Sequence, residues 1–225
     1  MLFWITRSIA WSLLHTVYFL FGGIRFEGTE HVPLQGGVLV TPNHISNADG
    51  PTIALALPRA CWIMVDEDVF AMRVVGPLVK WLHGFPVKRY TADHAALRRA
   101  KDLLQEGEVV VIFPEGKLST NGELQALLPG ALLAARSANV PIIPTAIFGT
   151  DRILPYGKLL PRPAGCRIVV RFGTPVTVGE LMGNIKGGKA IKSGAERLGA
   201  ILRALQLGEP YPEFTDENLV VDTPV

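Results

Sequence analysis

Short apolar runs that alternate with helical stretches restrict the fold of this chain more than any other feature of its sequence. Each run is bounded by glycine, proline or polar residues, as strands buried in a sheet usually are. The runs cover residues 37–42, 60–65, 85–87, 108–113, 140–148 and 166–172. Because strands that alternate with helices form a sheet with helices packed on its faces, the pattern predicts an α/β fold with a mixed, largely parallel central sheet.

Three stretches between or after these runs are predicted to be helices. The first begins at a cap on Thr91 and ends at Gly107, since threonine favours the start of a helix and glycine its end. The second starts after Pro129 and runs to about Asn139, and the third covers about residues 189–207.

A length of 225 residues is enough for one domain with a large core and too short for two full-sized domains. We assign residues 1–24 to an apolar helix and residues 25–208 to the single domain. Residues 209–225 form a polar, proline-rich tail that is predicted to be loosely held.

The amino-terminal 24 residues are unusually apolar. Their length would suffice to span a bilayer, but Arg7 lies inside the segment and its polar residues gather on one side at helical spacing. Trp4, Trp11 and Tyr18 are aromatic residues of the kind favoured at the level of lipid headgroups. We therefore expect a helix that lies in the membrane interface, and burial against the chain's own domain is the alternative.

The cysteines and the charge pattern argue against some classes of site. Cys61 and Cys166 are far apart and form no C-x-x-C motif, so a zinc or redox site has no support and no metal is expected. The net charge is only +2, yet seven basic residues and one acid lie between Arg73 and Lys101. Such a segment suggests an anionic partner or else a solvated helix face. Few aromatic residues are interleaved with it, which argues against nucleic acid.

Polar residues follow the first apolar run, where α/β proteins place their sites: at the end of a strand and before a helix. His44 and Asp49 are five residues apart there, so a turn can bring the carboxylate to one nitrogen of the imidazole. That contact would fix the tautomer and leave the other nitrogen free to accept a proton. Taken alone, such a pair is more often a loop hydrogen bond than a catalytic dyad.

Two further segments place polar groups after apolar runs. The run at 108–113 leads to Glu115 and Gly116, where the glycine would allow a ligand to approach closely. A solvated turn is the alternative reading of that segment. Lys88 and Arg89 follow another run, and together they would be able to clamp a phosphate, the arginine by a bidentate fork and the lysine as a point charge.

Taken together, these segments resemble the lysophosphatidate acyltransferase family of the glycerolipid acyltransferases. Four motifs carry the resemblance, in the family's order. They are N-H-x-x-x-x-D (Asn43, His44, Asp49), P-V-x-R (Pro86, Val87, Arg89), F-P-E-G (Phe113, Pro114, Glu115, Gly116) and V-P-I-x-P (Val140, Pro141, Ile142, Pro144). The resemblance covers about residues 25–178 and includes the apolar amino-terminal helix.

The resemblance implies an O-acyltransferase with a glycerol-3-phosphate acyltransferase-like fold. His44 would act as general base and Asp49 would orient it, while a fatty acyl group passes from acyl-CoA or acyl carrier protein to the hydroxyl of a lysophospholipid. The expected acceptor is 1-acyl-glycerol-3-phosphate, which gives phosphatidic acid. The other implied site residues are Lys88, Arg89, Glu115, Gly116 and Lys117 on the acceptor side and Pro141 on the acyl-donor side.

The resemblance also sets expectations about partners. Acyl-CoA or acyl carrier protein is a substrate, so no metal or bound cofactor is expected. Membrane lipids are expected partners and nucleic acid is not. The chain is expected on the cytoplasmic face of a membrane. Oxyanion donors are not identified by the sequence, and a backbone N–H near Gly50 or Gly116 is one option.

One departure from the family leaves the acceptor headgroup open. The third motif continues with Lys117, Leu118 and Ser119 where T-R-S is common, which is closer to bacterial relatives that act on other lysophospholipids. Two other classes of function also stay open. One is an acyl-lipid hydrolase that uses the same histidine to activate water. The other is a non-catalytic membrane-binding domain that uses the apolar helix and the basic segment.

Overall fold

The computed structural model describes residues 12, 16, 18–20, 22–89, 91, 93–158, 160–163, 165–185 and 188–214. Most of the helix predicted over residues 1–24 therefore lies outside the described residues, and so do residues 215–225 of the tail. Among the helices that are described, none has both the length and the apolar character needed to cross a bilayer.

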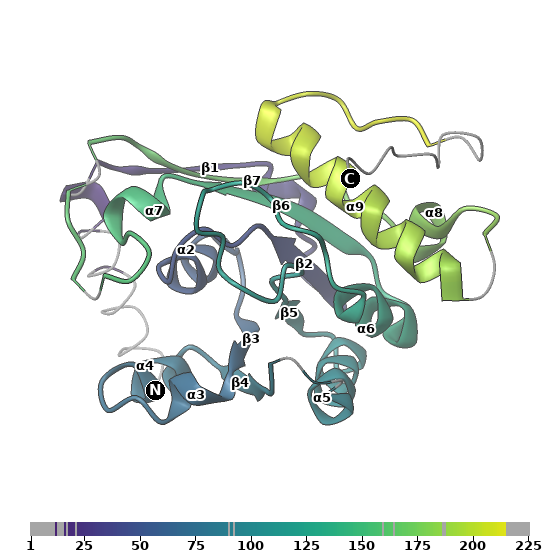
Figure 1. Cartoon of the computed structure of the whole chain (residues 1–225), viewed down its shortest axis with the longest axis horizontal. Coiled ribbons are helices and arrows are strands. Elements are labelled where there is room, and N and C mark those ends of the chain that lie inside the picture. The colour runs from purple at the N-terminus through teal and green to yellow at the C-terminus, as the bar shows by residue number, and fades with distance from the viewer. Residues whose placement is uncertain are drawn as a thin grey trace.

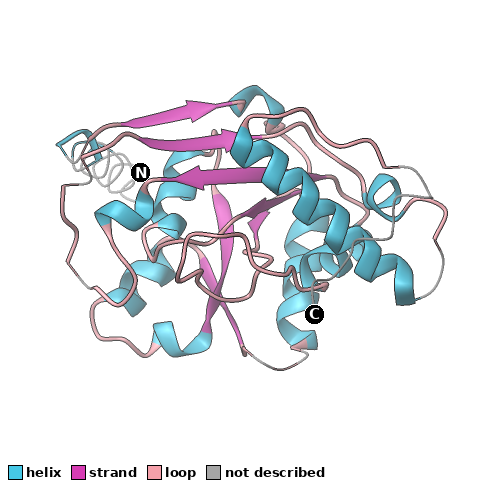
Figure 2. Cartoon of the chain, turned by 45° about the horizontal axis from the view of Figure 1, so that its top comes forward, coloured by secondary structure: helices cyan, strands magenta, loops and turns pink. Residues whose placement is uncertain are grey.

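A seven-stranded sheet forms the centre of the described chain, with the strand order β1-β7-β6-β2-β5-β3-β4 (Figure 1). The strands are β1 (Ile24–Glu27), β2 (Val38–Pro42), β3 (Cys61–Asp66), β4 (Gly84–Val87), β5 (Val109–Val111), β6 (Ile142–Phe148) and β7 (Ile168–Phe172). Strands β2 to β6 are parallel to one another, while β7 pairs antiparallel with β6 and parallel with β1. The prediction of a mixed, largely parallel sheet is confirmed, and Figure 2 shows its strong twist.

Strand β1 was not predicted from the sequence. Strand β1 is four residues long, lies at the edge of the sheet, and alternates charged with apolar residues in the sequence Ile-Arg-Phe-Glu. An edge strand is only half covered, so it lacks the continuous apolar run that identified the central strands.

Helices cover both faces of the sheet. They are α2 (Asp49–Ala56), α3 (Glu67–Phe70), α4 (Val75–Trp81), α5 (His94–Gln105), α6 (Gly130–Ala138), α7 (Thr150–Ile153), α8 (Val178–Met182) and α9 (Gly188–Leu207), with a 3-10 turn at Thr29–His31. Successive strand residues point to opposite faces. Leu39 accordingly packs with α5, α6, α8 and α9, while its neighbours Val38 and Val40 pack with α2. Both faces are buried, which explains why the central strands are apolar throughout.

The cap of α5 differs from the prediction. The side chain of Asp93, not that of Thr91, accepts hydrogen bonds from the backbone N–H groups of Ala95 and Ala96, at 3.1 and 3.0 Å. The predicted end is confirmed, because Gly107 has a φ of 89° and its N–H donates to the carbonyl of Leu104. A positive φ of this kind is adopted by glycine at little cost.

The described part of the tail, residues 209–214, contacts the domain, and the loose attachment expected for residues 209–225 stays a prediction. Tyr211 and Phe214 pack against the core cluster beneath α9. The hydroxyl of Tyr211 donates to the carbonyl of Thr174 at 3.3 Å, and the guanidinium of Arg197 lies over the ring of Phe214. Two aromatic side chains bury enough apolar surface to fix a short polar segment.

Candidate active site

The carboxyl ends of the five parallel strands meet at one edge of the sheet, and the polar residues singled out in the sequence gather there. This edge carries Asn43 and His44 after β2, Asp66 at the end of β3, Lys88 and Arg89 after β4, Glu115 and Gly116 after β5, and Thr150 after β6. Sites in α/β proteins form at this edge because the loops that leave parallel strands converge on it.

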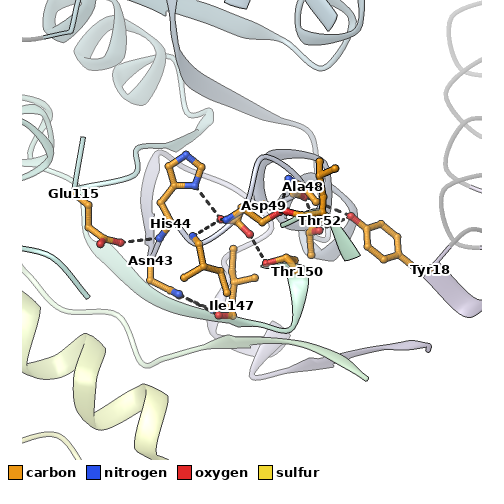
Figure 3. A network of polar contacts seen from close by, with 12 residues as sticks. Tyr18, Asn43, His44, Ala48, Asp49, Thr52, Glu115, Ile147 and Thr150 are labelled. Carbon is orange, nitrogen blue, oxygen red and sulfur yellow. Dashed lines mark hydrogen bonds and ion pairs between the residues drawn. The ribbon is translucent and has the colours of Figure 1, made fainter. Parts of the chain in front are cut away.

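His44 and Asp49 are in direct contact. The Nδ1 atom of His44 lies 2.9 Å from Oδ2 of Asp49 (Figure 3). Asp49 is fully buried, and the same oxygen accepts the backbone N–H groups of Ile45 and Ser46, both at 2.8 Å. Its other oxygen accepts the hydroxyl of Thr150 at 2.6 Å. Four donors therefore fix the carboxylate, which is far more than a solvated loop contact requires.

This contact determines the chemistry available to the imidazole. Because Nδ1 donates its proton to Asp49, the neutral ring has no proton on Nε2, which is free to accept one. Figure 3 shows that Nε2 points away from the polar network around Asp49. The ring of His44 stacks on that of Phe113 with centroids 4.1 Å apart, and only 14% of its side chain is exposed. The histidine is therefore held in one orientation.

Asn43 fixes the backbone just before His44. Its side chain bridges to the neighbouring strand β6, where Nδ2 donates to the carbonyl of Ile147 at 3.1 Å and Oδ1 accepts the N–H of Ile147 at 2.7 Å. Asn43 is buried, so these bonds replace contacts with water. The amide in effect continues the pairing of β2 with β6 beyond the end of β2.

The carboxylate of Glu115 holds the backbone of His44 in place. One carboxylate oxygen accepts the backbone N–H of His44 at 2.7 Å, and the other accepts the N–H of Gln125 at 2.8 Å. Only 3% of the residue is exposed. Burial raises the pKa of Glu115, and the two backbone N–H groups lower it by less. Glu115 links the histidine backbone to the loop that follows β5, and its predicted place beside the acceptor stays a prediction.

Gly116 and Lys117 begin that loop. Gly116 has a φ of 67°, a left-handed conformation that strains any residue with a side chain, and a Cβ added there would also displace the Leu128 side chain, whose methyl group would lie 2.4 Å away. Lys117 is exposed. The loop returns to the site, where the N–H of Ser119 donates to the carbonyl of His44 at 2.7 Å and that of Leu128 donates to the carbonyl of Pro114 at 2.7 Å.

Lys88 and Arg89 share the edge with His44 but do not contact it. Three strand spacings separate β4 from β2 in the sheet order, which corresponds to about 14 Å. The guanidinium of Arg89 pairs with the carboxylate of Asp66 at 2.9 Å, and Lys88 is exposed. The two cations therefore stand at the far end of this edge, where only a ligand that extends along it reaches both them and the histidine.

Pro141 lies at the opposite end of the sheet. It precedes β6, and its carbonyl accepts the N–H of Leu39 near the start of β2. Six residues of parallel strand separate it from the level of His44, or about 20 Å. Its assignment to the acyl-donor side stays a prediction, and the geometry gives Pro141 no contact with the groups around His44.

The sequence analysis missed two contributions to the site. Thr150 follows β6 at the same edge as His44, and this position was the available signal. Tyr18 was read only as a membrane aromatic, yet its hydroxyl lies 2.5 Å from that of Thr52, which donates to the carbonyl of Ala48. Burial raises the pKa of Tyr18 to about 12, so the phenol remains a donor. These contacts tie the described end of the amino-terminal segment to α2, the helix that begins with Asp49.

Metal ligands are not concentrated anywhere in the described part of the chain. Within those residues, no group of three or more histidine, cysteine, aspartate or glutamate side chains is arranged to hold a metal ion.

Comparison with known proteins gives a consistent result. The Acyltransferase family model matches residues 23–148. The 1-acyl-sn-glycerol-3-phosphate acyltransferase of Bacillus subtilis (strain 168) is 29% identical over 139 residues, which are 61% of this chain and 69% of that protein. The chloroplastic 1-acyl-sn-glycerol-3-phosphate acyltransferase LPAT1 of Arabidopsis thaliana is 30% identical over 138 residues, 60% of this chain and 38% of that protein. The mouse 1-acyl-sn-glycerol-3-phosphate acyltransferase alpha is 33% identical over 138 residues, 59% of this chain and 47% of that protein.

Some of these relatives are much longer than the matched region, and the similar solved structure is distant in sequence. The chain spans less than two thirds of the plant and mouse relatives. Among solved structures, the 1-acyl-sn-glycerophosphate acyltransferase PlsC from Thermotoga maritima superposes with a TM-score of 0.65, covering 90% of this chain and 79% of that one at 21% identity. At that identity the likeness supports the fold alone.

Proposed function

The chain belongs to the Acyltransferase family, and on that premise we propose that it transfers a fatty acyl group from a thioester to the free hydroxyl of a lysophospholipid. The observation that carries the proposal is the pair formed by His44 and the buried Asp49, with Nδ1 bound and Nε2 available. A general base needs this arrangement, in which one ring nitrogen is fixed by a carboxylate and the other meets the substrate.

The proposed transfer is direct, without an acyl-enzyme. The Nε2 atom of His44 takes the proton of the acceptor hydroxyl as its oxygen attacks the thioester carbonyl. The new oxygen–carbon bond forms, the carbon–sulfur bond breaks, and the imidazolium returns the proton to the leaving thiolate. Asp49 stabilises the imidazolium in between, and its bonds to Ile45, Ser46 and Thr150 keep it in place.

The proposed acceptor is 1-acyl-glycerol-3-phosphate, and the product is phosphatidic acid. Support comes from the names of the relatives, which act on this acceptor. Lys88, Arg89 and Lys117 are cations on or beside the same sheet edge and are the proposed ligands of its phosphate. A different lysophospholipid headgroup is the alternative acceptor, because Lys117 stands where the family commonly has threonine.

The donor is proposed to be acyl-CoA or acyl carrier protein, each as a substrate and not as a bound cofactor. We also propose that the reaction uses no metal, because a histidine–aspartate pair suffices to activate a hydroxyl. Two backbone N–H groups, those of Gly116 and Gly50, are candidates to stabilise the oxyanion. The N–H of Gly116 already donates to the carbonyl of Phe113, so it is not the proposed donor. Gly50, in the first turn of α2, remains the proposed donor because helix amino termini stabilise negative charge.

The chain is proposed to act at the cytoplasmic face of a membrane. The apolar segment that precedes β1 is the proposed interfacial helix, and the substrate itself is a lipid. Phe19 and Leu20, which belong to this segment and are described, are strongly exposed. Exposed apolar side chains of this size favour contact with another apolar phase.

A panel of lysophospholipids, offered with labelled acyl-CoA and separately with labelled acyl carrier protein, tests the proposal. Mass spectrometry of the products identifies the acceptor and the donor in one measurement. Acylation of lysophosphatidate by the wild-type chain, and its loss in His44→Ala, is the expected result. Free fatty acid without any acylated acceptor would indicate a hydrolase. Vesicle binding without turnover of any substrate would indicate a non-catalytic domain.

A further inference from the structure

Four exposed basic residues lie on α7 and on the segment that joins it to β7. They are Arg152, Lys158, Arg162 and Arg167. With Asp151 as the one acid between residues 150 and 167, four positive charges and one negative charge leave this segment at +3, although the whole chain is only +2. In the part of the chain that is described, none of the four cations takes part in an ion pair. Their charges therefore face solvent without compensation.

Large apolar side chains are exposed among these cations. On the same segment, Tyr156 is 61% exposed and Leu160 is 81% exposed. Phe19 and Leu20, at 78% and 70%, border an open hollow of about 660 Å³ together with Arg25 and Arg167. The end of the amino-terminal segment is fixed beside this hollow, because Tyr18 packs with Ile153 and Ile168 in one cluster. We call the set of Phe19, Leu20, Arg152, Tyr156, Lys158, Leu160, Arg162 and Arg167 the α7–β7 surface.

The α7–β7 surface begins at the active site. The hydroxyl of Ser46, in the turn between His44 and Asp49, donates to the carbonyl of Leu154 at 2.8 Å. Thr150, the first residue of α7, donates to Asp49. In Figure 1, α7 and the segment after it lie on the same side of the sheet as α2, whereas α5 and α9 lie on the other side. Whatever binds this surface is therefore positioned next to the catalytic pair.

We propose that the α7–β7 surface docks on an anionic phospholipid bilayer. Uncompensated cations interleaved with exposed aromatic and aliphatic side chains fit the headgroup level of such a membrane, where the cations meet lipid phosphates and the apolar groups enter the acyl region. A soluble polyanionic carrier would be served by the charges alone and would leave Leu160 and Phe19 exposed to water. Docking here rests on and deepens the proposed function, since it would hold the chain on the membrane that carries a lipid acceptor.

Vesicle co-sedimentation of the full chain tests this surface. The test variant carries Arg152→Gln, Lys158→Gln, Arg162→Gln and Arg167→Gln. The matched control carries Arg98→Gln, Lys189→Gln, Lys192→Gln and Arg203→Gln, which removes the same charge from exposed positions on α5 and α9. Each basic residue near an anionic membrane raises partitioning by about fivefold. The test variant should thus bind phosphatidylglycerol-containing vesicles at least about tenfold more weakly than wild type, while the control stays close to wild type.

Co-sedimentation, together with a measurement of the KM for acyl carrier protein, separates the other outcomes. Equal partitioning of the test and control variants would overturn the proposal. So would unchanged vesicle binding combined with a raised KM for acyl carrier protein, because the surface would then belong to the donor. Leu160→Ser, which leaves the charges in place, should weaken the binding that survives high salt. His44→Ala should partition like wild type, so this measurement stands even if the chain proves not to be an acyltransferase.

Discussion

The hydroxyl of Thr150 donates to the carboxylate of Asp49 at 2.6 Å, although 101 residues separate them in the chain. Both side chains are fully buried. Thr150 follows β6 and Asp49 begins α2, so this bond ties two loops of the sheet edge together beneath His44. A carboxylate that is fixed on both oxygens has one orientation available toward the imidazole.

Thr150→Val should therefore reduce kcat by about tenfold and the free energy of unfolding by about 1–3 kcal/mol, the cost of leaving a charged buried acceptor one donor short. The acceptor KM should change little, since Thr150 acts through Asp49. Thr150→Ser keeps the donor and should recover most of kcat. A serine variant as slow as the valine variant would mean that packing, not the hydrogen bond, matters here. Steady-state kinetics and urea unfolding provide both readouts.

His44→Ala should lower kcat by about 10² to 10⁴-fold, the usual value of general-base catalysis. Asp49→Asn should be comparably severe, because an amide is able to hold the imidazole in the wrong tautomer. Phe113→Leu, which removes only the ring stacked on His44, is the control and should cost much less. Turnover of the alanine variant within a few-fold of wild type would rule out His44 as the base.

Arg89→Ala should raise the KM for a phosphate-bearing acceptor by about tenfold or more, as expected for one lost charged hydrogen bond, with little change in kcat. Arg89→Lys should recover only part of this effect, because an ammonium lacks the bidentate fork. Arg73→Ala, an exposed arginine before α4, serves as the control. A change limited to the donor KM would instead assign Arg89 to the carrier.

The raised pKa of Glu115 predicts a pH dependence of stability. Because the folded chain holds this proton more tightly than the unfolded chain, its contribution is fully present below the unfolded value near 4.5 and is lost as the pH rises through the folded value. The difference in unfolding free energy between wild type and Glu115→Gln should accordingly shrink as the pH rises from about 4 and then level off. Urea unfolding across this range measures it, and a difference that grows with pH would contradict the assignment.

Asp93 predicts the opposite pH dependence. Backbone N–H groups, that of Ala96 foremost, lower its pKa from 3.8. The cap therefore contributes stability above the unfolded value and loses it as the pH falls through the folded value. Asp93→Ala should cost about 1 kcal/mol at neutral pH and less in strong acid, where the neutral carboxyl caps more weakly. Thr91→Ala should reduce the free energy of unfolding by less than Asp93→Ala at every pH, because Thr91 does not cap α5. An equal reduction would show that Thr91 is the cap.

The amino-acid sequence determined the features that depend on neighbouring residues. The apolar runs marked six of the seven strands; the central strands are apolar because both faces of the sheet are covered, and β4, although at an edge, is also apolar in sequence. His44 and Asp49 were found because a five-residue turn is enough to join them. Gly107 marked a helix end because its backbone conformation is local.

Only the tertiary structure decided which distant residues meet. Strand order places β5 and β6 on either side of β2, and that order brings Glu115 to the backbone of His44 and Thr150 to the carboxylate of Asp49. The parallel direction of β6 and β2 puts Pro141, which precedes β6, a strand length away from the site. Strand order results from the packing of the whole sheet, in which every apolar strand is a plausible neighbour of every other. No local sequence pattern determines the strand order, because the free energy that selects this order comes from burying all the strands and helices together.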